Sequence, residues 1–141
     1  MKIINGKLII LHCSATTSRA DIDVETIRKW HTSEPRNWSD VGYHFVIKTD
    51  GTIQNGRPLS RAGAHARKHN HNIGVCYVGG VNDDGKPEDN MTEKQEAAFI
   101  QLVSYLRLIL GKPYEIAGHN EFSNKACPSF NVKTKFKHLI L

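Results

Sequence analysis

Continuous apolar runs along the chain predict buried strands. Residues 8–11 are apolar at every position, which is typical of a strand that is covered on both faces. This strand is expected to end at His12 and Cys13. Residues 73–78 predict a second buried strand, and residues 114–117 predict a short strand that leads to His119.

Residues 43–47 have a different pattern, because apolar side chains occupy every second position. The alternation begins at Tyr43 and ends shortly before an Asp50-Gly51 turn, which predicts a strand that enters a tight hairpin. Residues 57–72 lack any periodicity and contain three histidines, so we expect a long surface loop there. Long ordered loops in compact domains are often functional.

Three segments have the spacing of apolar side chains that predicts an amphipathic helix. The first can be capped by Asp23, and its inward face consists of Val24, Ile27 and His31. The second has well-defined ends, since Thr92 and Gln95 form a capping box and Gly111 follows the last apolar position. The third is C-terminal, and its inward side chains are expected to be Val132, Phe136, Leu139 and Ile140.

The order of these elements predicts an α/β (mixed) fold. Strands that alternate with helices indicate a central mixed β-sheet, here flanked by about three helices. The length of 141 residues fits a single domain that covers residues 1–141. The composition, 39% hydrophobic and 23% charged, is that of a globular chain and not of a disordered one.

The termini and the charge narrow the classes of partner. The N-terminal apolar run is interrupted by polar residues, so it does not resemble a secretory signal, and no run approaches the ~18 apolar residues of a membrane span. A net charge of +5 favours an anionic partner, such as nucleic acid or bacterial cell wall. The basic residues are scattered, however, so a solvated positive surface explains them equally well, and direct nucleic-acid binding is disfavoured.

Histidine and cysteine supply the candidate chemistry. His119 and Cys127 flank a polar loop that can fold back on itself, and His12 follows a strand end that fixes the direction of its imidazole. Two nitrogens and one thiolate suit zinc, and three protein ligands leave a fourth position for water, as in catalytic sites. Spacing alone leaves an alternative open, namely two core histidines and a buried cysteine.

Two further side chains could assist such a site. Lys125 lies two residues before Cys127, so in an extended loop both side chains point the same way, and its ammonium could neutralise charge on a carbonyl oxygen. Tyr43 could offer its phenol to water at the metal. The ordinary alternatives are a solvated lysine and a half-buried packing tyrosine.

Five blocks together resemble a known family. In order, they are LHCSAT, IRKWH, DVGYHFVIKTDGTI, AGAHARKHNHNIGVCYVGG and GHNEFSNKACPSF. They are similar to the zinc-dependent N-acetylmuramoyl-L-alanine amidases of type 2, which include the lysozymes of T-odd phages and share a fold with peptidoglycan recognition proteins. The resemblance implies one zinc ion in a surface cleft, with His12, His119 and Cys127 as ligands. It further implies catalytic roles for Tyr43 and Lys125 and substrate-binding roles for Trp30, His31 and His65.

The implied reaction is hydrolysis of the amide bond between the lactyl group of N-acetylmuramic acid and L-alanine in peptidoglycan. Three alternatives stay open: a thiol hydrolase with Cys127 as nucleophile and His119 as base, a non-catalytic peptidoglycan-binding module, and a polymerase-binding regulator. Whether Tyr43 acts as acid, base or hydrogen-bond donor is also open. The expected protein is a monomer, made in the cytoplasm without a signal peptide, that reaches the cell wall after holin-type release or injection.

Overall fold

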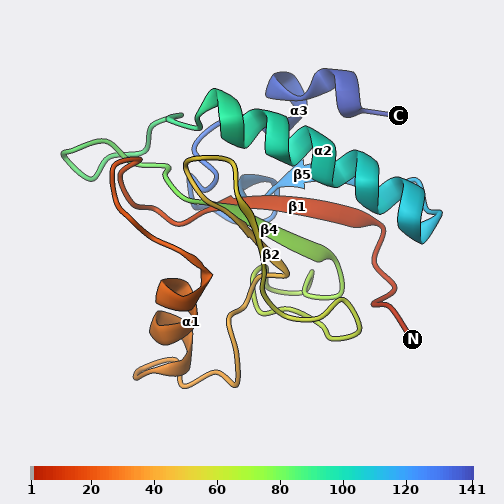
Figure 1. The fold of residues 1–141 in the computed structure, drawn as a ribbon, viewed down its shortest axis with the longest axis horizontal. Helices are drawn as coiled ribbons and strands as arrows, with labels where there is room; N and C mark the ends of the chain where they lie inside the picture. Colours follow the sequence, from red (N-terminus) through yellow and green to blue (C-terminus); the bar gives the residue numbers. More distant parts are fainter. Residues whose placement is uncertain (1) are drawn as a thin grey trace.

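A five-stranded mixed sheet forms the centre of the molecule (Figure 1). The computed structural model describes residues 2–141. The strands are β1 (Leu8–Cys13), β2 (Phe45–Ile47), β3 (Ile53–Asn55), β4 (Ile73–Tyr77) and β5 (Glu115–Gly118). Their spatial order is β3-β2-β4-β1-β5, and only the edge strand β3 runs antiparallel to its neighbour. The expected mixed sheet is therefore confirmed.

The apolar runs form the central strands because both faces of the sheet are covered. All five residues of β4 are buried, as are five of the six residues of β1. Within β1, Ile9 and Leu11 contact the larger of two hydrophobic clusters. His12 alternates with them along the strand, so its side chain emerges on the opposite face.

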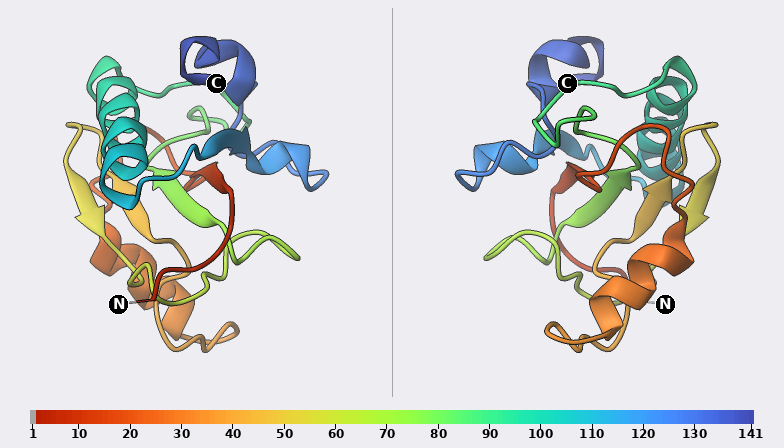
Figure 2. Two further views of the ribbon diagram at one scale, coloured as in Figure 1. Left: turned by 90° about the vertical axis from the view of Figure 1, so that its right-hand side faces the viewer. Right: turned by 90° about the vertical axis from the view of Figure 1, so that its left-hand side faces the viewer.

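Helices cover the two faces unequally (Figure 2). On one face lie α2 (Glu93–Leu110) and the short α3 (Val132–Lys135), which bury the larger hydrophobic cluster with the sheet. On the other face lies α1 (Val24–Thr32), whose Val24 and Ile27 pack with Val46 and Cys76. Two single 3-10 turns complete the elements: η1 (His119–Glu121) and η2 (Lys137–Leu139).

The predicted helix ends are confirmed. The Asp23 carboxylate accepts the Thr26 N–H at 2.9 Å, and the first helix buries its predicted face, including His31. Thr92 and Gln95 form the reciprocal capping box of α2. Gly111 ends this helix with φ at 62°, a left-handed conformation that glycine adopts without strain.

Three details differ from the predictions. Tyr43 lies two residues before β2 instead of within it. The C-terminal segment is α3 followed by η2, and Ile140 lies beyond both, with 43% of its surface exposed, because the short helix ends before a further turn can bring that side chain inward. The 57–72 segment forms neither helix nor strand, as expected, yet Arg57 and Ala66 within it are buried.

The longest helix does not have the character of a membrane span. Across residues 2–141, none of the helices combines sufficient length with sufficient hydropathy to cross a bilayer. The exposed surface of α2 does include apolar side chains, at Tyr105, Leu108 and Ile109.

Candidate active site

The register of the sheet brings two histidines together at the carboxyl ends of parallel strands. Leu11 of β1 pairs with Gly118 of β5. His12 follows Leu11 and His119 follows Gly118, and the ring centroids of the two histidines lie 4.5 Å apart. The carboxyl ends of the strands in an open α/β sheet are a usual location for ligand sites.

Cys127 reaches this position from the loop that follows η1. Its Sγ accepts the backbone N–H of Cys13 at 3.2 Å, which ties the loop to the end of β1. The ligand atoms of His12, His119 and Cys127 all lie within 4.8 Å of one another. Within residues 2–141, this is the one group of three or more His, Cys, Asp or Glu side chains with such spacing.

Both imidazoles are held in the form that binds metals. Burial, followed by the charges of His65, His119 and Lys125, lowers the pKa of His12 well below its ordinary value. Burial and then Lys125 also lower the pKa of His119. Metal binding requires a neutral imidazole, so no proton has to be removed from either ring near pH 7.

A cavity of about 250 Å³ opens beside the three residues. It is lined by residues from the end of β1, from α1, from η1 and from four loops. Every predicted site residue except Trp30 lines it. The lining residues are His12, Cys13, Ser14, Ala15, His31, Arg36, Trp38, Tyr43, Ala64, His65, His119, Lys125 and Cys127.

The phenol of Tyr43 is held in its protonated form. Its ring centroid lies 5.1 Å from that of His12 and 5.6 Å from that of His31. Burial, and then the neighbouring cysteines, raises the pKa of Tyr43 well above 10. A phenol with a raised pKa can donate a hydrogen bond at neutral pH, and the role of base is disfavoured.

Lys125 is exposed on the polar loop and lines the cavity from the solvent side. Its positive charge lowers the pKa of both His12 and His119. The ammonium and the two imidazoles therefore belong to the same cavity, as the position of Lys125 two residues before Cys127 predicts.

His31 and His65 contact the cavity in different ways. His31 Nδ1 accepts the Gly42 N–H at 2.9 Å, and its ring packs against Trp38 with centroids 4.7 Å apart. His65 uses both ring nitrogens inside the protein: Nδ1 lies 2.8 Å from His12 Nε2, and Nε2 lies 2.9 Å from the Asn72 carbonyl oxygen.

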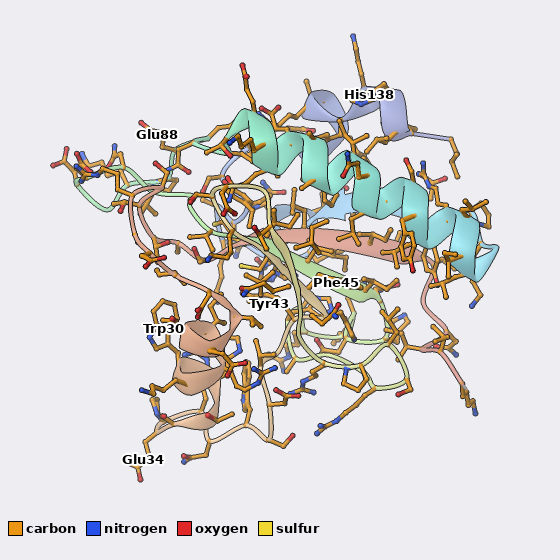
Figure 3. The ribbon with its side chains drawn as sticks, in the orientation of Figure 1. Trp30, Glu34, Tyr43, Phe45, Glu88 and His138 are labelled. Atoms are coloured by element: carbon orange, nitrogen blue, oxygen red, sulfur yellow. The ribbon has the colours of Figure 1, made fainter. Side chains whose placement is uncertain are left out.

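Trp30 is the predicted residue that the fold does not bring to the cavity. Its side chain is 42% exposed on α1, and Figure 3 shows it on the outer side of that helix, away from Tyr43. Trp38 and Arg36 line the cavity instead, with the guanidinium 5.4 Å from the indole centroid. Trp38 was not identified from the sequence. It could have been noticed as a large apolar ring in a polar segment that offers no helix or strand face on which to pack.

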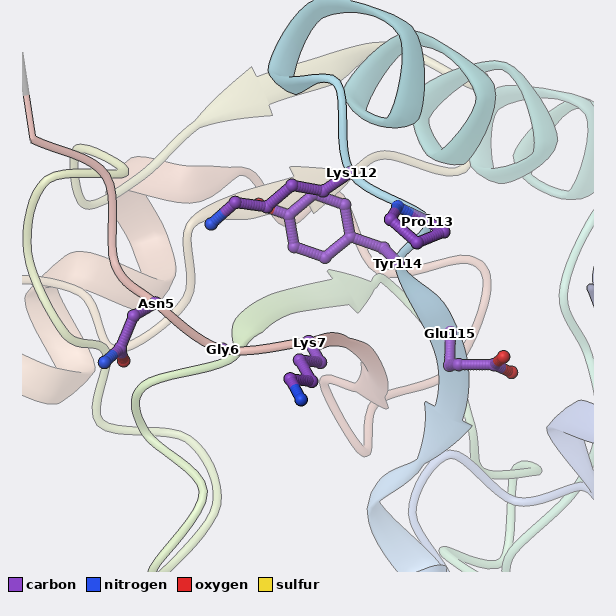
Figure 4. A pocket seen from close by; sticks show the side chains of 7 residues that line it. All are labelled: Asn5, Gly6, Lys7, Lys112, Pro113, Tyr114 and Glu115. Carbon is purple, nitrogen blue, oxygen red and sulfur yellow. The ribbon is translucent and has the colours of Figure 1, made fainter.

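A second cavity lies at the opposite ends of the strands. It has a volume of about 410 Å³ and is lined by residues 5–7 and 112–115 (Figure 4). Lys7 lies directly before β1 and Glu115 is the first residue of β5, so this cavity lies at the other end of β1 from His12. It holds none of the predicted site residues.

The geometry disfavours a thiol nucleophile. In such a pair the base lies within hydrogen-bonding reach of the thiol. Among residues 2–141, the hydrogen bonds of Cys127 Sγ go to the Cys13 backbone, and none joins it to the His119 ring. Hydrogen bonding with Cys13, and burial, also raise the pKa of Cys127, which opposes a free thiolate.

Comparisons with known proteins identify the family of this chain. The family model described as N-acetylmuramoyl-L-alanine amidase matches residues 4–130. The endolysin of Escherichia phage T7 is 46% identical over 129 residues, which cover 89% of this chain and 82% of the endolysin. The endolysin of Enterobacteria phage K11 is 41% identical over 124 residues, with coverage of 87% and 80%.

Solved structures with the same fold come from bacteria and insects. The N-acetylmuramoyl-L-alanine amidase LysC from Clostridium intestinale has a TM-score of 0.77 at 28% identity, covering 95% of this chain and 87% of LysC. Drosophila PGRP-LB has a TM-score of 0.79 at 22% identity, with coverage of 96% and 83%, and it supports the fold alone. The chain belongs to the N-acetylmuramoyl-L-alanine amidase family, and it is an amide hydrolase that acts on peptidoglycan.

Proposed function

We propose that residues 1–141 form a single zinc-dependent amidase domain that cleaves the bond between the lactyl group of N-acetylmuramic acid and L-alanine. His12, His119 and Cys127 would hold one zinc ion. The observation that carries this proposal is the convergence of their three ligand atoms within 4.8 Å at the carboxyl edge of the sheet.

The donor set fits zinc in kind and in number. Imidazole nitrogen and thiolate sulfur are its common ligands, and catalytic zinc sites use three protein ligands and leave one position open. Tyr43 and Lys125 line the same cavity as the three candidate ligands, so both would lie near a zinc ion held there. When bound, zinc polarises the amide carbonyl and lowers the pKa of water from 15.7 to ~7.

Lys125 would stabilise the negative charge that develops on the amide oxygen. It is exposed, so its flexible side chain can follow the substrate without a cost in buried charge. Its charge lowers the pKa of both imidazoles, which supports a role beside the proposed metal site.

Tyr43 would act as a hydrogen-bond donor. Because burial keeps its phenol protonated, the hydroxyl can orient the attacking water or the carbonyl oxygen, and the role of base is disfavoured. Of the three roles that the sequence leaves open for Tyr43, namely acid, base and hydrogen-bond donor, the raised pKa disfavours that of base.

The substrate would enter between α1 and the polar loop. His31 and Trp38 form one wall there, and Arg36 adds a positive charge to it. Trp30 could meet only those parts of a glycan or peptide that extend beyond the cavity, since it lies on the outer side of α1.

An endolysin role is the cellular setting we propose, since the phage T7 and K11 relatives carry that name. The protein would act as a monomer on the cell wall after holin-type release, with injection by a secretion device as the alternative route. Nucleic acid and polymerase have no part in this proposal.

The test is mass spectrometry of purified muropeptides digested by the protein as purified, after chelation, and after zinc is restored. We expect free L-alanine amino termini in the first and third samples only. Binding of muropeptide without any such product would favour a non-catalytic module, and activity that survives complete removal of metal would overturn the zinc mechanism.

A further inference from the structure

The His65 ring fills a narrow slot next to the ring of His12. Its ring stands at 89° to that of His12, with centroids 4.9 Å apart. Two glycines leave room for it: a Cβ at Gly63 or at Gly74 would lie 2.5 Å from His65 Cδ2. Gly74 lies within β4, where a side chain would otherwise be expected, so the strand forgoes one packing contact to admit this imidazole.

The hydrogen bonds of His65 run in one direction. The Asn72 carbonyl oxygen can only accept, so His65 Nε2, 2.9 Å away, must carry a proton and donate it. In a neutral ring, Nδ1 then holds a lone pair. That lone pair accepts a hydrogen bond from His12 Nε2 at 2.8 Å.

The same direction fixes the state of His12. If Nε2 carries the proton of a neutral ring, Nδ1 is the nitrogen with a free lone pair. Asn72, at the end of this series of hydrogen bonds, is itself held in place, because its side-chain oxygen accepts the N–H groups of Lys7 and Leu8 at the start of β1.

We propose that His65 is a positioning residue, which holds His12 in the Nε2-protonated tautomer through the relay Asn72 carbonyl–His65–His12 and so leaves His12 Nδ1 as the metal-binding nitrogen. This inference rests on the proposed zinc site. It replaces the substrate-binding role predicted for His65, because neither of its ring nitrogens is free to meet a substrate.

Partners of this kind orient metal-binding histidines and raise their basicity, and their loss typically weakens metal affinity ~10- to 100-fold. His65→Leu removes the acceptor while keeping a side chain of similar bulk. His65→Asn restores an acceptor at nearly the same place, since its amide oxygen and the lost Nδ1 are both bonded to Cγ. His69→Leu is the matched control, because His69 belongs to the same loop and packs on Phe122 instead of His12.

The first readout is the zinc dissociation constant, measured by competition with a chelating dye on variants whose folding is checked by circular dichroism. We expect His65→Leu to bind zinc ~10- to 100-fold more weakly, and His65→Asn and His69→Leu to stay within about threefold of the unmodified protein. Equal affinity of the folded His65→Leu protein would overturn the proposal. Equal weakening in folded Leu and Asn variants would also overturn it, since the slot would then matter only sterically.

The second readout needs no metal. Long-range ¹H–¹⁵N correlation spectra of the metal-free protein distinguish the two tautomers of each imidazole. We expect His12 to be protonated at Nε2, and a proton on Nδ1 would contradict the proposal even if His65→Leu failed to fold. Because this measurement is independent of zinc and of turnover, a protein that binds no zinc would refute the proposed function while leaving the tautomer assignment open to the test.

Discussion

At the scale of residues, the site separates the groups that hold a metal from the groups that meet the substrate. His12 is buried and Tyr43 is partly buried, and the surrounding fold shifts the pKa of both side chains. Lys125 is exposed, and its charge reaches the cavity from the solvent side. This division predicts that turnover can be lost while zinc binding is kept.

Replacement of Lys125 by alanine should remove turnover but not zinc. Loss of one group that stabilises a developing oxyanion typically lowers the rate ~100-fold or more. We therefore expect Lys125→Ala to keep one zinc per chain by elemental analysis and to lose about two orders of magnitude in kcat. Lys86→Ala, which removes the same charge from an exposed turn, serves as control. Near-normal hydrolysis by Lys125→Ala would exclude this lysine from the mechanism.

Replacement of Tyr43 by phenylalanine should also separate the two properties. It deletes one hydroxyl, and we expect a fall in kcat of ~100-fold with unchanged zinc content. Because burial raises the pKa of Tyr43 above 10, the unmodified protein should show no loss of activity from tyrosine ionisation between pH 7 and pH 10. The exposed Tyr105→Phe is the matched control. Equal kinetics of the two variants would show that the Tyr43 hydroxyl has no catalytic role.

At the scale of elements, Gln95 connects α2 to the sheet near the carboxyl ends of two strands. It is fully buried, and its amide nitrogen donates to the carbonyl groups of Ile47 and Val78 at 3.1 and 3.0 Å. Its amide oxygen accepts the Thr92 N–H as part of the capping box. The Gln95 side chain thus both caps the N-terminus of α2 and attaches this helix to the ends of β2 and β4.

Gln95→Met should be costly, although its volume is nearly unchanged. It would leave two buried carbonyl groups without this donor and the Thr92 N–H without its acceptor, and we expect a loss of roughly 2–3 kcal/mol in the free energy of unfolding. Urea denaturation measures it. The control is Gln101→Met, an exposed position of the same helix, for which a change within about 0.5 kcal/mol is expected. A loss no larger than that of the control would show that the bridge contributes little.

At the scale of the whole molecule, neutral buried histidines make stability depend on pH. Burial lowers the pKa of His31 and of His65 to about 4, and it lowers the pKa of His44 in the same direction. In the unfolded chain these imidazoles titrate near 6.5. Between the two values the unfolded state binds more protons, so the stability is complete above pH 6.5 and is lost as pH falls toward 4.

The melting temperature of the metal-free protein should therefore fall as pH is lowered from 7 to 4 at constant ionic strength. His31→Asn should fall less steeply, because its amide can still accept the Gly42 N–H but does not titrate. Differential scanning calorimetry of the two proteins measures the difference in slope. A melting temperature that stays constant or rises toward pH 4 would contradict the neutral state of these histidines.

The sequence predicted those parts of the molecule in which apolar residues recur at the spacing of a strand or a helix. The strand at 8–13 and the capped helix at 93–110 follow from apolar spacing and turn residues, and the structure confirms both. His12 could be located because a strand end fixes its direction. The meeting of His12 with His119 follows from the register of β1 and β5, which no local pattern encodes.

The remaining errors arise where tertiary contacts decide. Trp30 and Trp38 are both close to His31 in sequence, but only the bend of the segment after α1 turns Trp38 into the cavity. The inward position of His65 depends on space left by Gly63 in the same loop and by Gly74 in the strand that follows it. A fit between two glycines and a ring leaves no periodic signal in the sequence.

The central claim is that two imidazoles and one thiolate hold a single zinc ion with one position open. Zinc-edge X-ray absorption of the purified protein tests it most directly. We predict two nitrogen ligands at ~2.0–2.1 Å, one sulfur at ~2.3 Å and one further light atom from solvent. A shell without sulfur, or with four protein ligands and no position for solvent, would contradict the proposed site.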